Sequence, residues 1–224
     1  MTDDSQIRHS EADSAVVVTE EIARAQREAA NGLRQAERVR QSIVDVIDGR
    51  PFRLRPSTIL DLNRCAIEGL DAYAGNFRPG GVTINKSAHQ PPEGYFVPEL
   101  VEELCDYVND NWAASGSIHL ASMVMWRMNW VHPFTDGNGR TSRATSYRVL
   151  CAHSGILLAG SETIPEQIVA NRIPYYEALE AADARYKADR ALNSETVLDM
   201  QELMSAMLAR QLRGAFDAAN RSGR

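Results

Sequence analysis

The stretch that decides how this chain folds and what it can do reads His132-Pro133-Phe134-Thr135-Asp136-Gly137-Asn138-Gly139-Arg140-Thr141-Ser142-Arg143. Two glycines flank an amide at its centre, and glycine removes the side-chain bulk that keeps backbone N–H groups away from an anion. A helical pattern of apolar residues follows, up to Gly155 as a C-terminal stop. The Gly-Asn-Gly turn is therefore expected at a helix N-terminus, where free N–H groups and the macrodipole both favour phosphate.

Charged and titratable side chains surround this turn. Arg140 and Arg143 are three residues apart, so they project from one side of the first helical turn, and their planar forks suit phosphate oxygens. Asp136 could hold a magnesium ion that bridges phosphates, and His132 suits a general base. Alone, residues 137–139 would be an ordinary turn before a helix. The coincidence of all these residue types indicates a polyphosphate site.

Bulk properties narrow the class of protein. At 224 residues the chain fits one globular domain with a small helical appendage and can bury a full core. Its net charge of −6 and the lack of a basic block argue against nucleic-acid and membrane partners. The odd number of cysteines (Cys65, Cys105 and Cys151) indicates buried thiols in a reducing compartment. With no signal peptide or spanning run in the sequence, we expect a cytoplasmic protein.

Helical periodicity dominates the chain, so we expect an all-α protein with one small β-hairpin. Residues 1–14 are polar and aperiodic, which predicts a disordered tail. Residues 15–55 should form an N-terminal helix, with Thr19 as its N-cap, and a linker. Residues 56–190 are expected to form the core and 191–224 a C-terminal helix. The N-terminal helix is expected to bury Ile22, Leu33, Ala36, Val39, Ile43 and Ile47.

Two further segments bear on the site. Residues 75–92 break the helical pattern, and a β-prone run (Val82, Thr83, Ile84, then Asn85) lies within them. A surface hairpin is the plain interpretation, but its edge is also a candidate for docking an extended peptide. The run 118–131 is apolar nearly all round, which predicts a buried central helix leading directly into the motif.

The stretch 132–143 resembles the signature of the Fic (filamentation induced by cAMP) family, His-x-Phe-x-Asp/Glu-Gly-Asn-Gly-Arg-x-x-Arg, with every specified position filled. Residues 74–78 resemble the end of that family's first core helix, residues 82–85 its flap, and residues 175–179 the segment that borders the nucleotide. The resemblance implies a Fic-type helical bundle with the hairpin as a flap near the active site. No P-loop string is present.

This resemblance implies a protein adenylyltransferase, which moves AMP from ATP to a Ser, Thr or Tyr hydroxyl of a target protein and releases pyrophosphate. His132 would be the catalytic base, Asp136 would hold Mg²⁺, and residues 82–85 would pair with the target backbone. The residues expected to bind ATP are Asp136, Gly137, Asn138, Gly139, Arg140, Thr141, Ser142, Arg143, Tyr175 and Tyr176.

Alternatives stay open at this point. A Fic-fold transferase could move another phosphate-linked group, or the chain could be a non-catalytic nucleotide-binding scaffold. Many relatives carry an inhibitory helix, Ser/Thr-x-x-x-Glu-Gly/Asn, whose glutamate pairs with the second signature arginine, here Arg143. The nearest upstream stretch has Gln26 and Ala30 at the Ser/Thr and Glu positions. We therefore hypothesise weak self-inhibition, inhibition by Glu28, or inhibition by a partner protein; self-modification and a homo-oligomer are further expectations.

Overall fold

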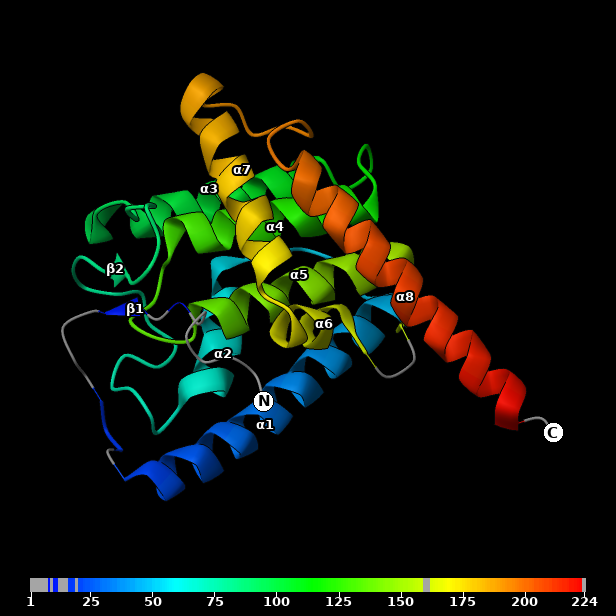
Figure 1. Ribbon diagram of the computed structural model, residues 1–224, viewed down its shortest axis with the longest axis horizontal. Helices are drawn as coiled ribbons and strands as arrows, with labels where there is room; N and C mark the ends of the chain where they lie inside the picture. The colour runs from blue at the N-terminus through cyan, green and yellow to red at the C-terminus, as the bar shows by residue number, and fades with distance from the viewer. Residues whose placement is uncertain (1–7, 9, 12–15, 19, 159–161, 223–224) are drawn as a thin grey trace.

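The computed structural model describes residues 8, 10–11, 16–18, 20–158 and 162–222. Helices make up nearly all of the regular structure, which confirms the all-α prediction (Figure 1). None of the described helices is both long and apolar enough to cross a lipid bilayer. In chain order the elements are β1 Ser10–Glu11, α1 Glu21–Ile47, α2 Pro56–Ile67, β2 Thr83–Ile84, a 3₁₀ turn η2 Gly94–Phe96, α3 Val97–Asp110, α4 Ser117–Val131, α5 Asn138–Ser154, α6 Ile164–Ala170, α7 Ile173–Asp189 and α8 Leu198–Ser222.

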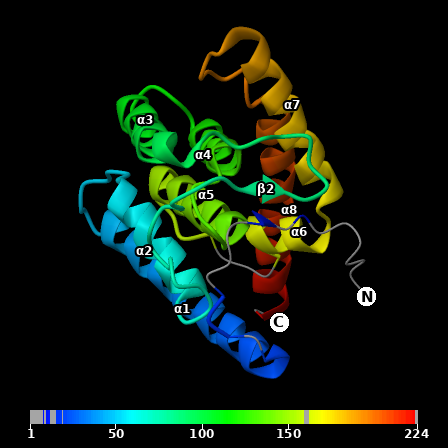
Figure 2. The same ribbon diagram turned by 90° about the vertical axis from the view of Figure 1, so that its left-hand side faces the viewer.

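Helices α4 and α5 form the centre of the molecule. Helix α5 packs against α1, α2, α4 and α6, while α4 also packs against α3, α7 and α8. Figures 1 and 2 show α1 and α2 on one side of this pair and α7 with α8 on the other. The apolar side chains of α4 from Leu120 to Met128 are fully buried, as its all-round apolar pattern predicted. The chain segment between α4 and α5 is therefore held at both ends by buried helices.

The buried face of α1 differs in part from the expected one. Val39 and Ile43 are buried as predicted, whereas Ile22 and Leu33 are 69% and 75% exposed. The helix begins at Glu21, and the expected N-cap, Thr19, lies outside the described residues. Two more of the positions expected in the core are exposed, Ala36 and Ile47.

Amides rather than apolar side chains fix the N-terminal half of α1 to α2. The buried side chain of Asn31 donates to the carbonyl of Glu68 at 3.0 Å, and that of Gln35 donates to the carbonyl of Leu62 at 2.9 Å. A helix end leaves carbonyl groups without intrahelical partners, and Asn31 satisfies one just past the end of α2. Apolar spacing could not reveal this stripe, because its members are polar.

The flap segment forms one strand rather than the expected hairpin among the described residues. Strand β2 pairs antiparallel with β1, with Ser10 opposite Ile84 and Glu11 opposite Thr83. Two residues of the tail predicted to be disordered are thus in a strand; apart from these and Arg8, residues 1–14 lie outside the described part of the chain. A ladder this short, between segments so distant in sequence, has no periodic signal.

Replacing Gln35 by Ala should lower the free energy of unfolding by about 1–2 kcal/mol, because a buried hydrogen bond to α2 is lost. Urea titration followed by circular dichroism measures this change. The matched control is Gln41→Ala on the same helix, whose side chain donates to Asp45 at the exposed surface. That control should change stability by less than about 0.5 kcal/mol. Equal losses in the two variants would contradict the role of Gln35.

Candidate active site

A cavity of about 490 Å³ lies beside the turn between α4 and α5. The motif, the flap segment and α7 all contribute to its walls. Val82, Thr83 and Asn85 are not part of the lining, so only Ile84 of the four flap residues faces it. Among the residues expected from the sequence, the lining brings together His132, Asp136, Gly137, Asn138, Gly139, Arg140, Arg143, Ile84, Tyr175 and Tyr176.

Thr141 and Ser142 lie away from this cavity and are fully buried. The Thr141 hydroxyl accepts a hydrogen bond from Asn63 at 3.4 Å, and the Ser142 hydroxyl accepts one from Asn129 at 3.0 Å. On α5, these two positions face the neighbouring helices α2 and α4, while positions 139, 140 and 143 face the cavity. Their side chains hold α5 against α2 and α4 and do not face the space for the expected ligand.

The side chain of Asn138 closes the turn. Its Oδ1 accepts from the backbone N–H of Phe134 at 2.9 Å, and its Nδ2 donates to the carbonyl of Phe134 at 2.8 Å. The residue is only 3% exposed. We expected this amide to contact a phosphate, but both of its polar atoms already have partners within the turn. Asn138 is thus first a brace that fixes the turn's shape.

Backbone N–H groups at the start of α5 are left open by this turn. Gly137 has a φ of +78°, and a Cβ there would lie 2.7 Å from Cγ2 of Ile67, so only glycine fits. The first hydrogen bond of α5 runs from the N–H of Thr141 to the carbonyl of Gly137 at 2.8 Å. The N–H groups of residues 138–140 precede it and can donate hydrogen bonds to an anion in the cavity.

His132 ends α4 with a left-handed backbone, φ +50°. Its Nδ1 lies 3.3 Å from the carbonyl of Asn129. Since a carbonyl can only accept, Nδ1 carries the proton and the lone pair is on Nε2. That atom is buried and has no hydrogen-bond partner among the described residues. Burial, with a smaller contribution from the nearby Arg78, lowers the pKa of His132 to about 4, so the ring is neutral and its lone pair is on Nε2.

Arg78 fixes the base of the flap to the motif, a role that the sequence did not reveal. Its Nε donates to the carbonyl of His132 at 2.8 Å, and its two terminal nitrogens donate to the carbonyls of Gly80 and Pro92. The guanidinium thus satisfies three backbone groups at the points where the flap leaves and rejoins the domain. The only sequence signal was the position of Arg78 at the end of the 74–78 pattern.

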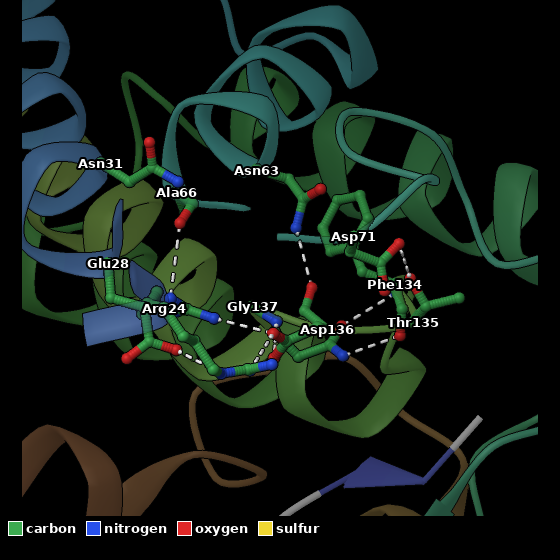
Figure 3. Close-up of polar contacts among 12 residues, drawn as sticks. Arg24, Glu28, Asn31, Asn63, Ala66, Asp71, Phe134, Thr135, Asp136 and Gly137 are labelled. Carbon is green, nitrogen blue, oxygen red and sulfur yellow. Dashed lines mark hydrogen bonds and ion pairs between the residues drawn. The ribbon is translucent and has the colours of Figure 1, made fainter. Parts of the chain in front are cut away.

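The cavity is cationic although the chain as a whole is acidic, with a net charge of −6. Asp136 neutralises part of this charge: its Oδ2 lies 3.0 Å from Arg140 and 3.7 Å from Arg24, and its Oδ1 accepts from Gly137 (Figure 3). Such a concentration of guanidinium groups is suited to a polyanion. The arginines in the lining are Arg8, Arg24, Arg140, Arg143 and Arg172.

Helix α1 contributes an arginine to the site rather than a glutamate. Glu28 pairs with Arg24 at 3.2 Å, and it is Arg24 that reaches Asp136 (Figure 3). Within the described residues no carboxylate pairs with Arg143, and burial lowers the pKa of its guanidinium. Ala30, at the position of the inhibitory glutamate, is exposed. The ion pair expected between an inhibitory glutamate and Arg143 is therefore not formed among the described residues.

Residues 53–150 match the sequence model of the Fic/DOC family. This part of the chain is a Fic domain. It comprises α2, the flap segment, α3, α4 and all but the last residues of α5, and hence His132 and the whole of the motif that follows it. Helix α1, which supplies Arg24, and helix α7, which supplies both tyrosines, lie outside the matched residues.

Curated relatives share the Fic domain with this chain. Protein adenylyltransferase fic-1 of Caenorhabditis elegans is 30% identical over 129 residues, which cover 56% of this chain and 23% of the relative. Protein adenylyltransferase Fic of Drosophila willistoni is 30% identical over 129 residues, covering 56% and 24%. The chain thus matches only about a quarter of the length of these relatives.

Solved structures of Fic proteins have the same fold. A Fic domain containing signaling protein from Bacteroides thetaiotaomicron superposes with a TM-score of 0.70 at 21% identity, covering 91% of this chain and 75% of the other. C. elegans Fic-1 superposes with a TM-score of 0.65 at 21% identity, covering 91% and 55%. At this identity the likeness establishes the fold, and it extends beyond the matched domain to most of the chain.

The low pKa of His132 predicts a pH-dependent stability. Its folded pKa of about 4 lies below the ordinary value near 6.5, so on acidification the unfolded chain binds this proton first. Stability is therefore lost as the pH falls through this window, by about 2 kcal/mol between pH 7.5 and pH 5. Urea titrations at both pH values, on the parent and on His132→Asn, isolate this residue. The same pH slope in both proteins would contradict the burial of a neutral imidazole.

Proposed function

We propose that this chain is a protein adenylyltransferase, which transfers AMP from ATP to a Ser, Thr or Tyr hydroxyl of a target protein. The observation that carries the proposal is the free, buried Nε2 of His132 in the wall of a cavity that also holds the open N-terminus of α5. A base and an anion site thus share one cavity. The relatives named protein adenylyltransferase support the same reaction.

The reaction requires one proton acceptor and stabilisation of charge on phosphate. The target hydroxyl oxygen attacks the α-phosphorus of ATP, the bond to the β-phosphate oxygen breaks, and pyrophosphate leaves. Nε2 of His132 takes the hydroxyl proton, a step that typically contributes on the order of 10² to 10⁴ in rate. The N–H groups at the start of α5 stabilise the growing charge on the α-phosphate. Arg140 and Arg143 orient and neutralise the leaving pyrophosphate.

Asp136 is suited to hold a magnesium ion together with the phosphates. The described residues contain no cluster of three or more metal-ligating side chains, so the protein would supply a single carboxylate. Mg²⁺ is commonly bound by one or two carboxylates, substrate phosphates and water, and Asp136 at the cavity wall fits that ligand set. When bound, the ion would neutralise phosphate charge.

The nucleotide base is assigned to the space beside Tyr175, which is buried, with its hydroxyl 2.8 Å from Asn129. Tyr176, the next residue on α7, also lines the cavity, but two adjacent positions of a helix cannot both face the adenine. Strand β2 of the flap would pair with the target backbone and bring its hydroxyl toward His132. A Fic transferase that moves another phosphate-linked group stays an alternative, since the cavity recognises phosphate before it recognises the base. We place this activity in the cytoplasm, because all three cysteines are free.

His132→Ala should abolish AMP transfer while ATP binding changes little, because the N–H groups at the start of α5 are untouched. The purified protein is incubated with magnesium, a cell lysate and ATP labelled at the α- or the γ-phosphate. Label from the α position alone identifies AMP transfer, and label from the γ position identifies a kinase. The control is His153→Ala, outside the cavity. Unchanged transfer in His132→Ala would remove the base assignment, and no labelling by the parent would favour the scaffold.

Arg24→Ala should lower the magnesium concentration needed for half-maximal ATP binding, because Arg24 and the ion compete for Asp136. The pair is half-exposed and 3.7 Å long, so we expect a change of about twofold to fivefold. Calorimetric ATP titrations at several magnesium concentrations measure it. The control is Arg38→Ala, which lies on the same helix as Arg24 and breaks a surface pair with Asp61 of α2. Weaker ATP binding in Arg24→Ala would instead show that Arg24 contacts the phosphates.

A further inference from the structure

The edge of the flap strand is already occupied in this structure by the chain itself. Strand β1, Ser10–Glu11, lies antiparallel on β2, Thr83–Ile84. Figures 1 and 2 both show the two strands side by side at the margin of the helical bundle. Under the proposed function a target segment has to form the same backbone ladder. Only one segment can use the edge at a time.

Arg8 anchors this occupant on α7. Its guanidinium pairs with Glu180 and lies 4.1 Å from the centre of the Tyr176 ring, while its backbone N–H donates to the Tyr176 hydroxyl at 3.3 Å. The Arg8 side chain is only 16% exposed. An ion pair, a cation–π contact and a backbone hydrogen bond thus converge on one residue, two positions before the residue opposite Ile84.

Val16 and Val17, shortly before α1, contact the residues that follow α2. Val16 forms a bridge with Asp71, and the N–H of Val17 donates to the carbonyl of Leu70 at 3.0 Å. Arg8, Val16, Leu70, Asp71 and Ile84 all line the cavity that contains His132. Arg8 thus lies against α7, Ser10 and Glu11 lie on the flap strand, and Val16 and Val17 lie beside the residues that follow α2.

We propose that the edge of β2, together with Tyr176 and Glu180, is a docking site for an extended peptide segment that carries an arginine. Arg8 and strand β1 fill this site in the free protein. An incoming target displaces them and places its own basic side chain on Tyr176 and Glu180, two residues before the residue opposite Ile84. The identification of the incoming segment as a target rests on the proposed function; the docking site itself does not.

The occupant is held weakly enough to be displaced. Its ladder has two residues on each strand, and Glu180 is more than half exposed, so the ion pair is worth little. A tethered segment nevertheless has an effective concentration on the order of millimolar, which a free peptide must overcome. A competing segment should therefore bind much better once residues 8–11 are released.

The test measures binding of a fluorescein-labelled peptide with the sequence of residues 6–13, by anisotropy, to the full chain. The opened variant carries Arg8→Ala, Ser10→Pro and Glu11→Pro. In it, the protein's own segment can neither bind α7 through an arginine nor donate backbone hydrogen bonds to β2. We expect the peptide to bind this variant at least about tenfold more tightly than it binds the parent. Equal binding to both, or no binding to the opened variant, would overturn the proposal.

Two changes test the arginine site. A peptide with Arg8→Ala should bind the opened variant roughly tenfold more weakly, since an ion pair and a cation–π contact are lost. Adding Glu180→Gln to the opened variant should weaken binding of the unchanged peptide about twofold to fivefold. Glu177→Gln, at an exposed position of the same helix, should leave binding unchanged. Equal binding of the two peptides would refute the arginine site. None of these measurements uses ATP, so absence of AMP transfer would leave this result standing.

Discussion

The structure depends on one constraint, the reversal of the chain between two buried helices within residues 132–137. The backbone N–H and C=O of Phe134 are buried in that reversal, and both are satisfied by the side chain of Asn138. Buried backbone groups must find partners, and here one amide supplies both. Because the turn satisfies itself through a side chain, the N–H groups at the start of α5 are not consumed by it. Fold and anion site therefore follow from the same pair of hydrogen bonds.

Polar contacts from outside make the turn, the base and the flap one rigid unit. Asn63 of α2 accepts from the N–H of Gly75 at 2.9 Å and donates to the carbonyl of Asp136 at 3.0 Å. Arg78 binds the carbonyl of His132, and further along the flap His89 contacts the carbonyl of Trp130 at 2.8 Å. Catalytic groups are effective when their neighbours fix them in place. These contacts connect the turn to α2 and to the flap, so the position of the base does not depend on the turn alone.

The sequence predicts the elements whose pattern lies within one short stretch of chain, and it does not predict contacts between distant segments. The central helix α4, the helix after the motif and the turn between them follow from apolar spacing and glycine placement within about 40 residues. The approach of Arg24 to Asp136 and the pairing of β1 with β2 join segments that have no shared pattern. The motif as a contiguous string predicts Thr141 at the phosphates, whereas a helix of 3.6 residues per turn directs positions 139, 140 and 143 toward the cavity and 141 and 142 away from it.

One charged residue of the phosphate site and the occupant of the flap edge belong to the same part of the chain. Five arginines line it, and Asp136 is shared by two of them, so an entering polyanion competes with this carboxylate for both partners. One of the two, Arg24, lies in the first turns of α1, and the segment that precedes α1 is the one paired with the flap. The occupant of the flap edge and a counter-ion of the phosphate site are consequently parts of one continuous stretch of chain. Any free energy that couples release of one to movement of the other must act equally in both directions.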